Sequence, residues 1–314
     1  MRLAGALWWF WLMRGYWDEG LTWLKRSLQN PSITPARARP LVGLAMMEYY
    51  AGTVAKSQAL LNESLAQYRQ QGDKWGIAFT ASLTGSGESD PSRANALFQE
   101  AREIAQELQD EWLAARIGIG QGMYAARRGN RSLACSFYES ALDHARRAGD
   151  RWLIANALGY WGGAALDQGD DDRAAALFAE SLEVRRELGN KNGMAISLYG
   201  LGKIALHRHE GQRASEFFRQ ALALRREMGN TREVVKCLWA LGRAAATEQQ
   251  YEQAARLLGA IQSPCGMLND KDRCAYEDDV RAVCTHLDAA TSATALAAGC
   301  ALSLEEAIEA ALES

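Results

Sequence analysis

Proline and cysteine are scarce in this sequence, and neither sign of charge dominates. The 314 residues include 5 Pro and 6 Cys, and 35 Lys and Arg against 38 Asp and Glu give a net charge of -3. Scarce proline together with 48% hydrophobic residues excludes a disordered or collagen-like chain. The slightly acidic balance provides no general field for holding nucleic acid or an anionic membrane. We therefore expect a globular protein that binds neither directly.

Long apolar runs and paired cysteines are also missing. The longest apolar run, residues 3–13, falls short of the ~20 residues that cross a bilayer, and no small-residue cleavage site follows it. The cysteines show no CxxC spacing, so neither a disulfide framework nor a zinc site is indicated. These absences predict a cytoplasmic protein with reduced thiols.

The sequence lacks the motifs of catalysis and of cofactor binding. It has no GxxxxGK[ST] phosphate loop and no GxSxG nucleophile motif. The glycine-rich segment at 118–122 lacks the last glycine of a dinucleotide loop, because Met123 stands there. His209 and Glu210 begin an HExxH pattern, but Arg213 occupies the second ligand position. We predict no enzyme activity, no cofactor and no metal site; a concealed enzyme would require a pocket of perturbed ionisable groups.

What is present is a repeat of 40 residues. It is carried by alanines at Ala94, Ala134, Ala174, Ala214 and Ala254, and by glycines at Gly122, Gly162, Gly202 and Gly242. Apolar residues follow helical spacing throughout, and no segment alternates like a strand. Gly162 and Ala174 would let two helices of a hairpin approach closely, while Phe178 fills the gap between units. Since one hairpin cannot bury its own apolar face, the hairpins should stack.

The turns between helices repeat as well. Gly149-Asp150, Gly189-Asn190 and Gly229-Asn230 each combine a glycine that can close one helix in the left-handed conformation with a side chain that can cap the next. Gly129-Asn130 and Gly169-Asp170 mark the other turn of the unit.

The order of core residues resembles the tetratricopeptide repeat. The residues that carry the resemblance are Leu158, Trp161, Gly162, Ala165, Ala174, Phe178 and Ser181. The unit is longer than the usual 34 residues and lacks the terminal proline, which makes it similar to the repeat regions of bacterial LuxR-type regulators such as the maltose activator. The first segment and the tail at 299–312 resemble the carboxy-terminal repeats of STAND-type signalling ATPases. The resemblance implies an all-α, right-handed superhelical solenoid that binds protein or peptide.

We divide the chain into a solenoid of about seven hairpins at 1–263 and capping helices at 264–314. Ser263-Pro264 breaks the last repeat, and Ser303 with Glu306 forms a capping box that opens a final short helix. In the STAND-type family an ATPase module precedes the repeats, and this sequence has none. Because the first helix is apolar with no polar capping helix ahead of it, we expect a truncated or split larger regulator, or a stand-alone paralogue.

The inner wall of the solenoid is the predicted binding surface. If the first helix of each hairpin lines it, the helical register selects Arg116, Met123, Arg127, Asn156, Tyr199, Lys203, His207, Lys236, Trp239 and Arg243. Such a basic, partly aromatic groove suits an acidic or carboxylate-bearing peptide. The alternative is a solvated basic face or pairing of these cations within the chain.

The first helix concentrates aromatic residues at Trp8, Trp9 and Trp11. They form either the core of the first units or a docking face for an upstream NTPase module or a second copy of the chain.

We predict a non-catalytic binding scaffold, the regulatory or sensor region of a bacterial signal-transduction or transcription regulator. A partner lying along the groove would change the curvature of the array and pass that change to its neighbour. The alternative is a sensor that encloses a small ligand such as a sugar or a nucleotide.

Overall fold

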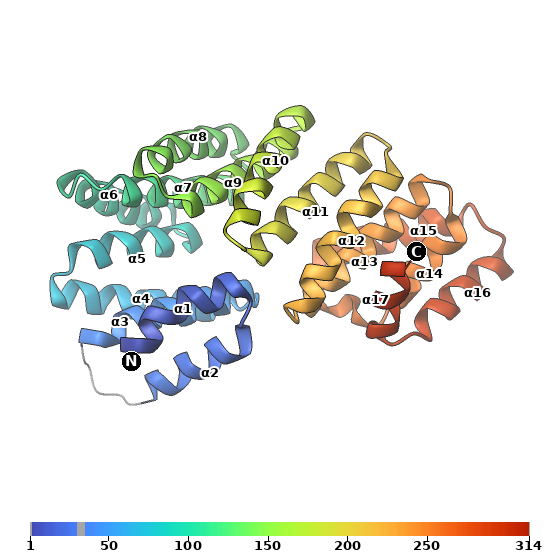
Figure 1. Cartoon of the computed structure of the whole chain (residues 1–314), viewed down its shortest axis with the longest axis horizontal. Coiled ribbons are helices and arrows are strands. Elements are labelled where there is room, and N and C mark those ends of the chain that lie inside the picture. The colour runs from blue at the N-terminus through green and yellow to red at the C-terminus, as the bar shows by residue number, and fades with distance from the viewer. Residues whose placement is uncertain (1, 30–34, 314) are drawn as a thin grey trace. The chain divides into compact units, whose positions relative to one another are not determined.

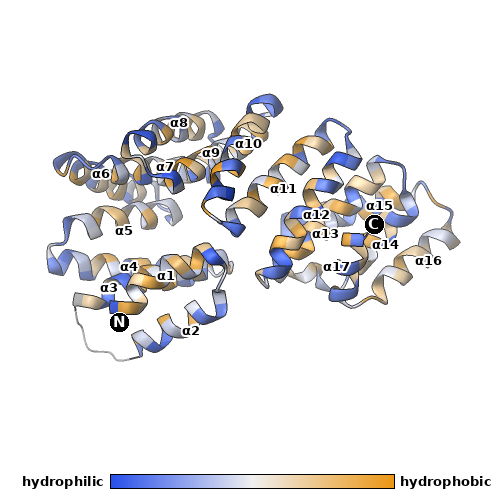
Figure 2. Cartoon of the chain, in the orientation of Figure 1, coloured by the Kyte–Doolittle hydropathy of each residue, from blue (hydrophilic) through white to orange (hydrophobic). Residues whose placement is uncertain are grey.

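The computed structural model describes residues 2–29 and 35–313. Over these two ranges the chain forms seventeen α-helices and two short 3-10 helices, and no strand (Figure 1). Hydrophobic and hydrophilic residues are interleaved along most helices, as expected for helices with one buried side (Figure 2). The predicted all-α repeat fold is therefore confirmed. None of the described helices is both long enough and apolar enough to cross a membrane.

The chain forms two compact units, Met1–Lys191 and Asn192–Ser314. The helices of the N-terminal unit are α1 (Arg2–Arg14), α2 (Trp17–Leu28), η1 (Pro35–Arg37), α3 (Ala38–Tyr50), α4 (Val54–Gln71), α5 (Lys74–Gly87), α6 (Pro91–Glu107), α7 (Glu111–Arg127), α8 (Arg131–Ala148), α9 (Arg151–Gln168) and α10 (Asp171–Glu187). Each odd-numbered helix packs against the even-numbered helix that follows it. The odd-numbered helices also contact each other, α1 with α3, α5 with α7 and α7 with α9, and so form an inner layer.

The C-terminal unit continues the hairpins and then departs from them. Its helices are α11 (Lys191–His207), α12 (Gly211–Glu227), α13 (Thr231–Thr247), α14 (Tyr251–Ala260), η2 (Pro264–Met267), α15 (Asp270–Cys284), α16 (Ala289–Cys300) and α17 (Leu304–Glu313). The repeat ends with α14, where the sequence predicts the break at Ser263-Pro264. The capping box is confirmed, because Ser303 N donates to Glu306 at 2.7 Å and Glu306 N donates to Ser303 Oγ at 3.3 Å.

The turns that the sequence predicts are also confirmed. Gly149 and Gly229 have φ of +66° and +65°, in the left-handed region that favours glycine. After these glycines, the side chains of Asp150 and Asn230 accept hydrogen bonds from the amides of Leu153 and Glu233. At these two boundaries one helix is closed and the next is capped within two residues.

The repeating glycines receive a bulky side chain from the second helix of the same hairpin. A Cβ atom placed on Gly162 would lie 3.2 Å from the Phe178 ring, and one on Gly202 would lie 2.5 Å from the Phe218 ring. At Gly122 a Cβ would lie closer still to the ring of Tyr138. The absence of a side chain is therefore what lets the two helices approach.

Gly122→Ala should lower the free energy of unfolding by about 1–2 kcal/mol, because the added methyl group overpacks a closed contact and outweighs the helix propensity gained. The ring it displaces, Tyr138, stacks on Tyr160 with ring centroids 5.9 Å apart. Urea denaturation followed by circular dichroism measures the change.

Gly163→Ala is the matched control. Nothing lies within 4 Å of a Cβ at this position, which is also inside a helix. Alanine there should raise stability by about 0.5–1 kcal/mol. Equal effects of the two substitutions would show that the glycines do not set the helix approach.

Candidate functional site

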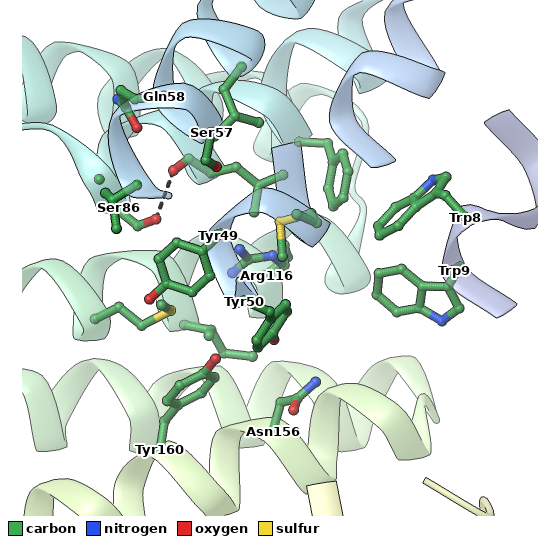
Figure 3. Close-up of a pocket in the computed structure, with 18 of the residues that line it drawn as sticks. Trp8, Trp9, Tyr49, Tyr50, Ser57, Gln58, Ser86, Arg116, Asn156 and Tyr160 are labelled. Carbon is green, nitrogen blue, oxygen red and sulfur yellow. Dashed lines mark hydrogen bonds between the residues drawn. The ribbon is translucent and has the colours of Figure 1, made fainter. Parts of the chain in front are cut away.

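The inner helices of the N-terminal unit surround one aromatic pocket (Figure 3). The free space within it is about 50 Å³. Its side chains come from α1, α3, α5, α7 and α9 and from the start of α4. The aromatic residues of the lining are Trp8, Trp9, Tyr49, Tyr50, Phe79, Trp152 and Tyr160. This space admits one small chemical group and not a whole drug-sized molecule, but the lining is mostly apolar with few polar groups, as in ligand-binding sites.

Contact between the first and fifth inner helices closes one side of the pocket. Trp9 on α1 and Trp152 on α9 lie with ring centroids 4.2 Å apart at an interplanar angle of 60°. Trp8 meets Trp9 edge to face at 4.8 Å. Aromatic pairs of this kind contribute about 0.5–1.5 kcal/mol beyond the area they bury. The N-terminal unit thus encloses its pocket between residues that are far apart in the sequence.

One charged residue, Arg116 on α7, faces this aromatic lining. Figure 3 shows its guanidinium between Tyr49 and Tyr50. The residue is only 6% exposed, and its Nη1 has no hydrogen-bond partner in the part of the chain that the structure describes. Burial lowers the pKa of Arg116, but an arginine begins so high that it stays charged at neutral pH. The pocket therefore contains a positive charge that no carboxylate of the described ranges pairs with.

The tyrosines around Arg116 are hydrogen-bond donors at neutral pH. Burial raises the pKa of Tyr49 to about 12. The adjacent Tyr160 and burial together raise the pKa of Tyr50 well above its ordinary value of 10.0. Since these hydroxyls stay protonated, the polar part of the pocket offers a guanidinium and O–H groups, a set suited to an oxyanion.

Three of the ten residues predicted to form the groove line this pocket. Arg116, Met123 and Asn156 do so, from α7 and α9. Arg127 does not, because its guanidinium donates to the carbonyl oxygens of Gly87, at 2.9 Å, and Glu88 at the end of α5.

The prediction missed Trp152 and Tyr160, two further lining residues on α9. They stand four residues before and four residues after Asn156, which puts all three on one face of the helix. Extending the register by one turn in each direction would have found them. Tyr49 and Tyr50 lie at the end of α3, in an early unit where the repeat is less regular.

The other predicted groove residues lie in the C-terminal unit, where acidic groups neutralise two of them. Lys236 lies 3.1 Å from Glu233 and 3.8 Å from Asp272. Arg243 lies 3.5 Å from Asp279, a residue of α15 whose pKa is raised by burial. The expectation of a free basic groove is therefore wrong for Lys236 and Arg243, and pairing within the chain describes them. Their carboxylate partners on α15 come from outside the repeat.

The remaining predicted residues of this unit have mixed surroundings. Trp239 is 8% exposed and donates from Nε1 to Asp279 at 2.7 Å. Tyr199 packs on Phe218, with ring centroids 5.3 Å apart. Lys203 is half-buried, and His207 lines an open depression beside Arg243. Across the described ranges, no group of three or more His, Cys, Asp or Glu could hold a metal ion.

The tryptophans of the first helix belong to the interior. Trp8 and Trp11 are 4% and 7% exposed, and Trp9 is half-buried against the pocket. The docking-face interpretation is therefore wrong for Trp8 and Trp11, which leave almost no surface for a partner. Phe10 and Trp23 are the aromatic residues that α1 and α2 leave exposed, at 48% and 54%.

The family model that matches the chain is the tetratricopeptide repeat, over residues 153–227. A protein of Mycobacterium bovis named as an HTH-type transcriptional regulator is 29% identical over 136 residues, 39% of this chain and 15% of the regulator. The chain thus spans less than a sixth of that relative.

Solved structures show the same fold. A STAND protein with a tetratricopeptide-repeat sensor from Pyrococcus horikoshii superposes with a TM-score of 0.62 at 16% identity, covering 88% of this chain and 44% of that one. A Rap protein complexed with Competence and Sporulation Factor superposes with a TM-score of 0.57 at 12% identity, covering 98% of each chain.

Proposed function

Because this chain is a tetratricopeptide-repeat protein, we propose that it is a non-catalytic recognition module whose binding site is the aromatic pocket of the N-terminal unit. One observation carries the proposal: helices from five successive hairpins converge on a pocket in which Arg116, the one cation of the described lining, is buried and forms no ion pair with any described carboxylate. In a packed protein interior a charged side chain is normally paired with an opposite charge, because burying an unpaired charge is costly.

The ligand we propose is a short segment of a protein or peptide whose end or side chain enters the pocket. A Rap protein of the same fold is known in complex with Competence and Sporulation Factor, which supports this class of partner. The likeness to a STAND sensor and to an HTH-type regulator supports a regulatory setting, and the location we propose is a bacterial cytoplasm. The proposal is thus a sensor region that reports occupancy to a signalling or transcription module.

The closed side of the pocket suggests how occupancy is reported. A ligand that touches both Trp9 and Trp152 binds more tightly when α1 and α9 are in contact than when they are apart. It therefore shifts the N-terminal unit toward the closed arrangement by the difference in affinity between the two states. A stacked array of hairpins allows this change, since each hairpin contacts only its neighbours.

A small-ligand sensor is the second candidate. The contact between Trp9 and Trp152 makes the pocket more enclosed than an open groove, and enclosure favours a compact molecule over a long peptide. Thermal shifts with metabolites and none with peptides would favour this candidate.

Selection from a displayed random-peptide library tests the proposal. Peptides that bind the wild-type chain should lose at least ten-fold in affinity for Met123→Trp, which fills the pocket with a larger side chain. Binding to Lys203→Glu/Arg243→Glu, altered only in the C-terminal unit, should be unchanged. Circular dichroism checks that each variant is folded. Binders that are indifferent to Met123→Trp, or that depend on Lys203 and Arg243, would contradict the proposal.

A further inference from the structure

The buried positive charge of Arg116 indicates that the pocket lacks a negatively charged group. A buried charge is normally paired, because leaving water is costly without a partner. The two buried carboxylates of the N-terminal unit are both engaged elsewhere: Glu48 with Lys56 at 2.5 Å, and Glu88 with Arg93 at 3.1 Å. No other carboxylate in the described part of the chain forms an ion pair with Arg116. The missing negative charge must therefore come from outside the chain.

We propose that the pocket binds a carboxylate attached to an apolar group, with Arg116 holding the carboxylate. This inference rests on the proposed function, since it takes the same pocket as the binding site. The planar fork of the Arg116 guanidinium matches the two oxygens of a carboxylate. A second buried guanidinium, that of Arg185 on α10, adjoins the lining, with its Nη2 3.4 Å from Asn156 Oδ1.

The polar neighbours of Arg116 also favour a carboxylate. In Figure 3 the rings of Tyr49 and Tyr50 lie on either side of the guanidinium, and Tyr160 projects from α9 toward the same pocket. The hydroxyls of Tyr49 and Tyr50, whose pKa values are raised, can donate to a carboxylate, which accepts at both oxygens and donates at neither. The combination discriminates against an amide, whose NH₂ group would face donors and would remain unpaired.

The apolar side chains of the lining determine which apolar group the ligand can carry. Trp8, Trp9 and Trp152 stand at one side of the pocket, and Phe79 also lines it. Trp9 is in direct contact with both Trp8 and Trp152, so these rings close that side and present an apolar wall to the ligand. Such a carboxylate occurs in free organic acids and at the C-terminus of a peptide that ends in an aromatic residue.

Isothermal titration calorimetry on the full chain distinguishes these sources. The probes are 2-naphthoate, its neutral analogue 2-naphthamide, and a hexapeptide ending in phenylalanine with either a free or an amidated C-terminus. We expect at least one acid to bind at least ten-fold more tightly than its amide. Binding of 2-naphthoate alone identifies a small organic acid, and binding of the free peptide acid identifies a C-terminal carboxylate.

Variants assign the effect to the guanidinium. Arg116→Met should remove the difference between acid and amide, and Arg116→Lys should keep part of it because the charge remains. Arg128→Met, at an exposed position just beyond the same helix, should leave every affinity unchanged.

Equal binding of acid and amide to the wild-type chain would overturn the inference, as would a folded Arg116→Met variant that still prefers the acid. Absence of binding by all four probes would overturn it too. The proposed function would survive each result if selected peptides still depended on Met123, so the two failures can be told apart.

Discussion

Arg116→Met is expected to stabilise the chain and, in the same variant, to weaken carboxylate binding about 100-fold. The substitution replaces a buried, uncompensated charge with an apolar side chain of similar length. Replacing buried charges by well-packed apolar groups stabilises proteins by about 1–4 kcal/mol, and we expect about 2 kcal/mol here. The affinity is lost because a hydrogen-bonded charge pair with the ligand can no longer form. Urea denaturation and calorimetry measure the two effects separately.

A gain in stability together with a loss of affinity distinguishes a binding residue from a structural one. A residue kept for its ligand lowers the stability of the empty protein, whereas a residue kept for packing raises it. Arg116→Lys is the control, since it retains a charge and should be no more stable than the wild type. A fall of more than about 1 kcal/mol for Arg116→Met would mean that the guanidinium holds the unit together, and would contradict the account.

The second large effect concerns the C-terminal unit, where Glu233→Gln should cost about 3 kcal/mol. Its partner Arg225 has a side chain only 4% exposed and lies 3.2 Å from the Glu233 carboxylate. Removing one member of a buried pair leaves the other charge without compensation, which typically costs 3–5 kcal/mol. Glu233 also lies in the first turn of α13, where a negative charge interacts favourably with the helix dipole. Chemical denaturation of the variant measures the loss.

Asp278→Asn is the matched control for this prediction. Asp278 pairs with Arg281 three residues along α15, and both side chains are more than two-thirds exposed. Exposed pairs of this kind contribute between about 0 and 1 kcal/mol, so the control should change stability little. A loss in the control equal to that of Glu233→Gln would show that burial of Arg225 is not the cause.

The same pair predicts how stability depends on pH. Burial opposes ionisation of Glu233, but Arg225 and Lys236 outweigh it and hold the pKa below its ordinary value of 4.5. The unfolded chain therefore binds the proton more tightly than the folded chain does. The contribution of Glu233 is fully present above about pH 4.5 and is lost as the pH falls through the folded-state value. The difference in stability between the wild type and Glu233→Gln should shrink over that interval.

The sequence predicts the parts of the fold that repeat. The contact of Gly162 with Phe178, the turns at Gly149 and Gly229, and the capping box at Ser303 are local, because each involves residues within one hairpin or one turn. Local spacing therefore suffices to predict them. The same register brings Arg116 and Asn156 to one pocket.

The rest depends on contacts that no period encodes. Trp9 meets Trp152 because small rotations between successive hairpins add up until α1 reaches α9. Arg243 is paired because α15, a helix outside the repeat, places Asp279 beside it. The spacing of residues in the sequence shows neither the accumulated rotation between hairpins nor the position of a helix outside the repeat. The enclosed pocket and the particular carboxylates that pair with these cations therefore cannot be predicted from the sequence.

The central claim is that recognition occurs inside the N-terminal unit, and hydrogen exchange read by mass spectrometry tests it most directly. The full chain would be compared with and without the tightest peptide from the library selection. We predict slower exchange in α1, α3, α7 and α9, whose side chains line the pocket, and unchanged exchange in α11 and α13. Protection confined to α11 and α13 would place the binding site in the C-terminal unit and contradict the account.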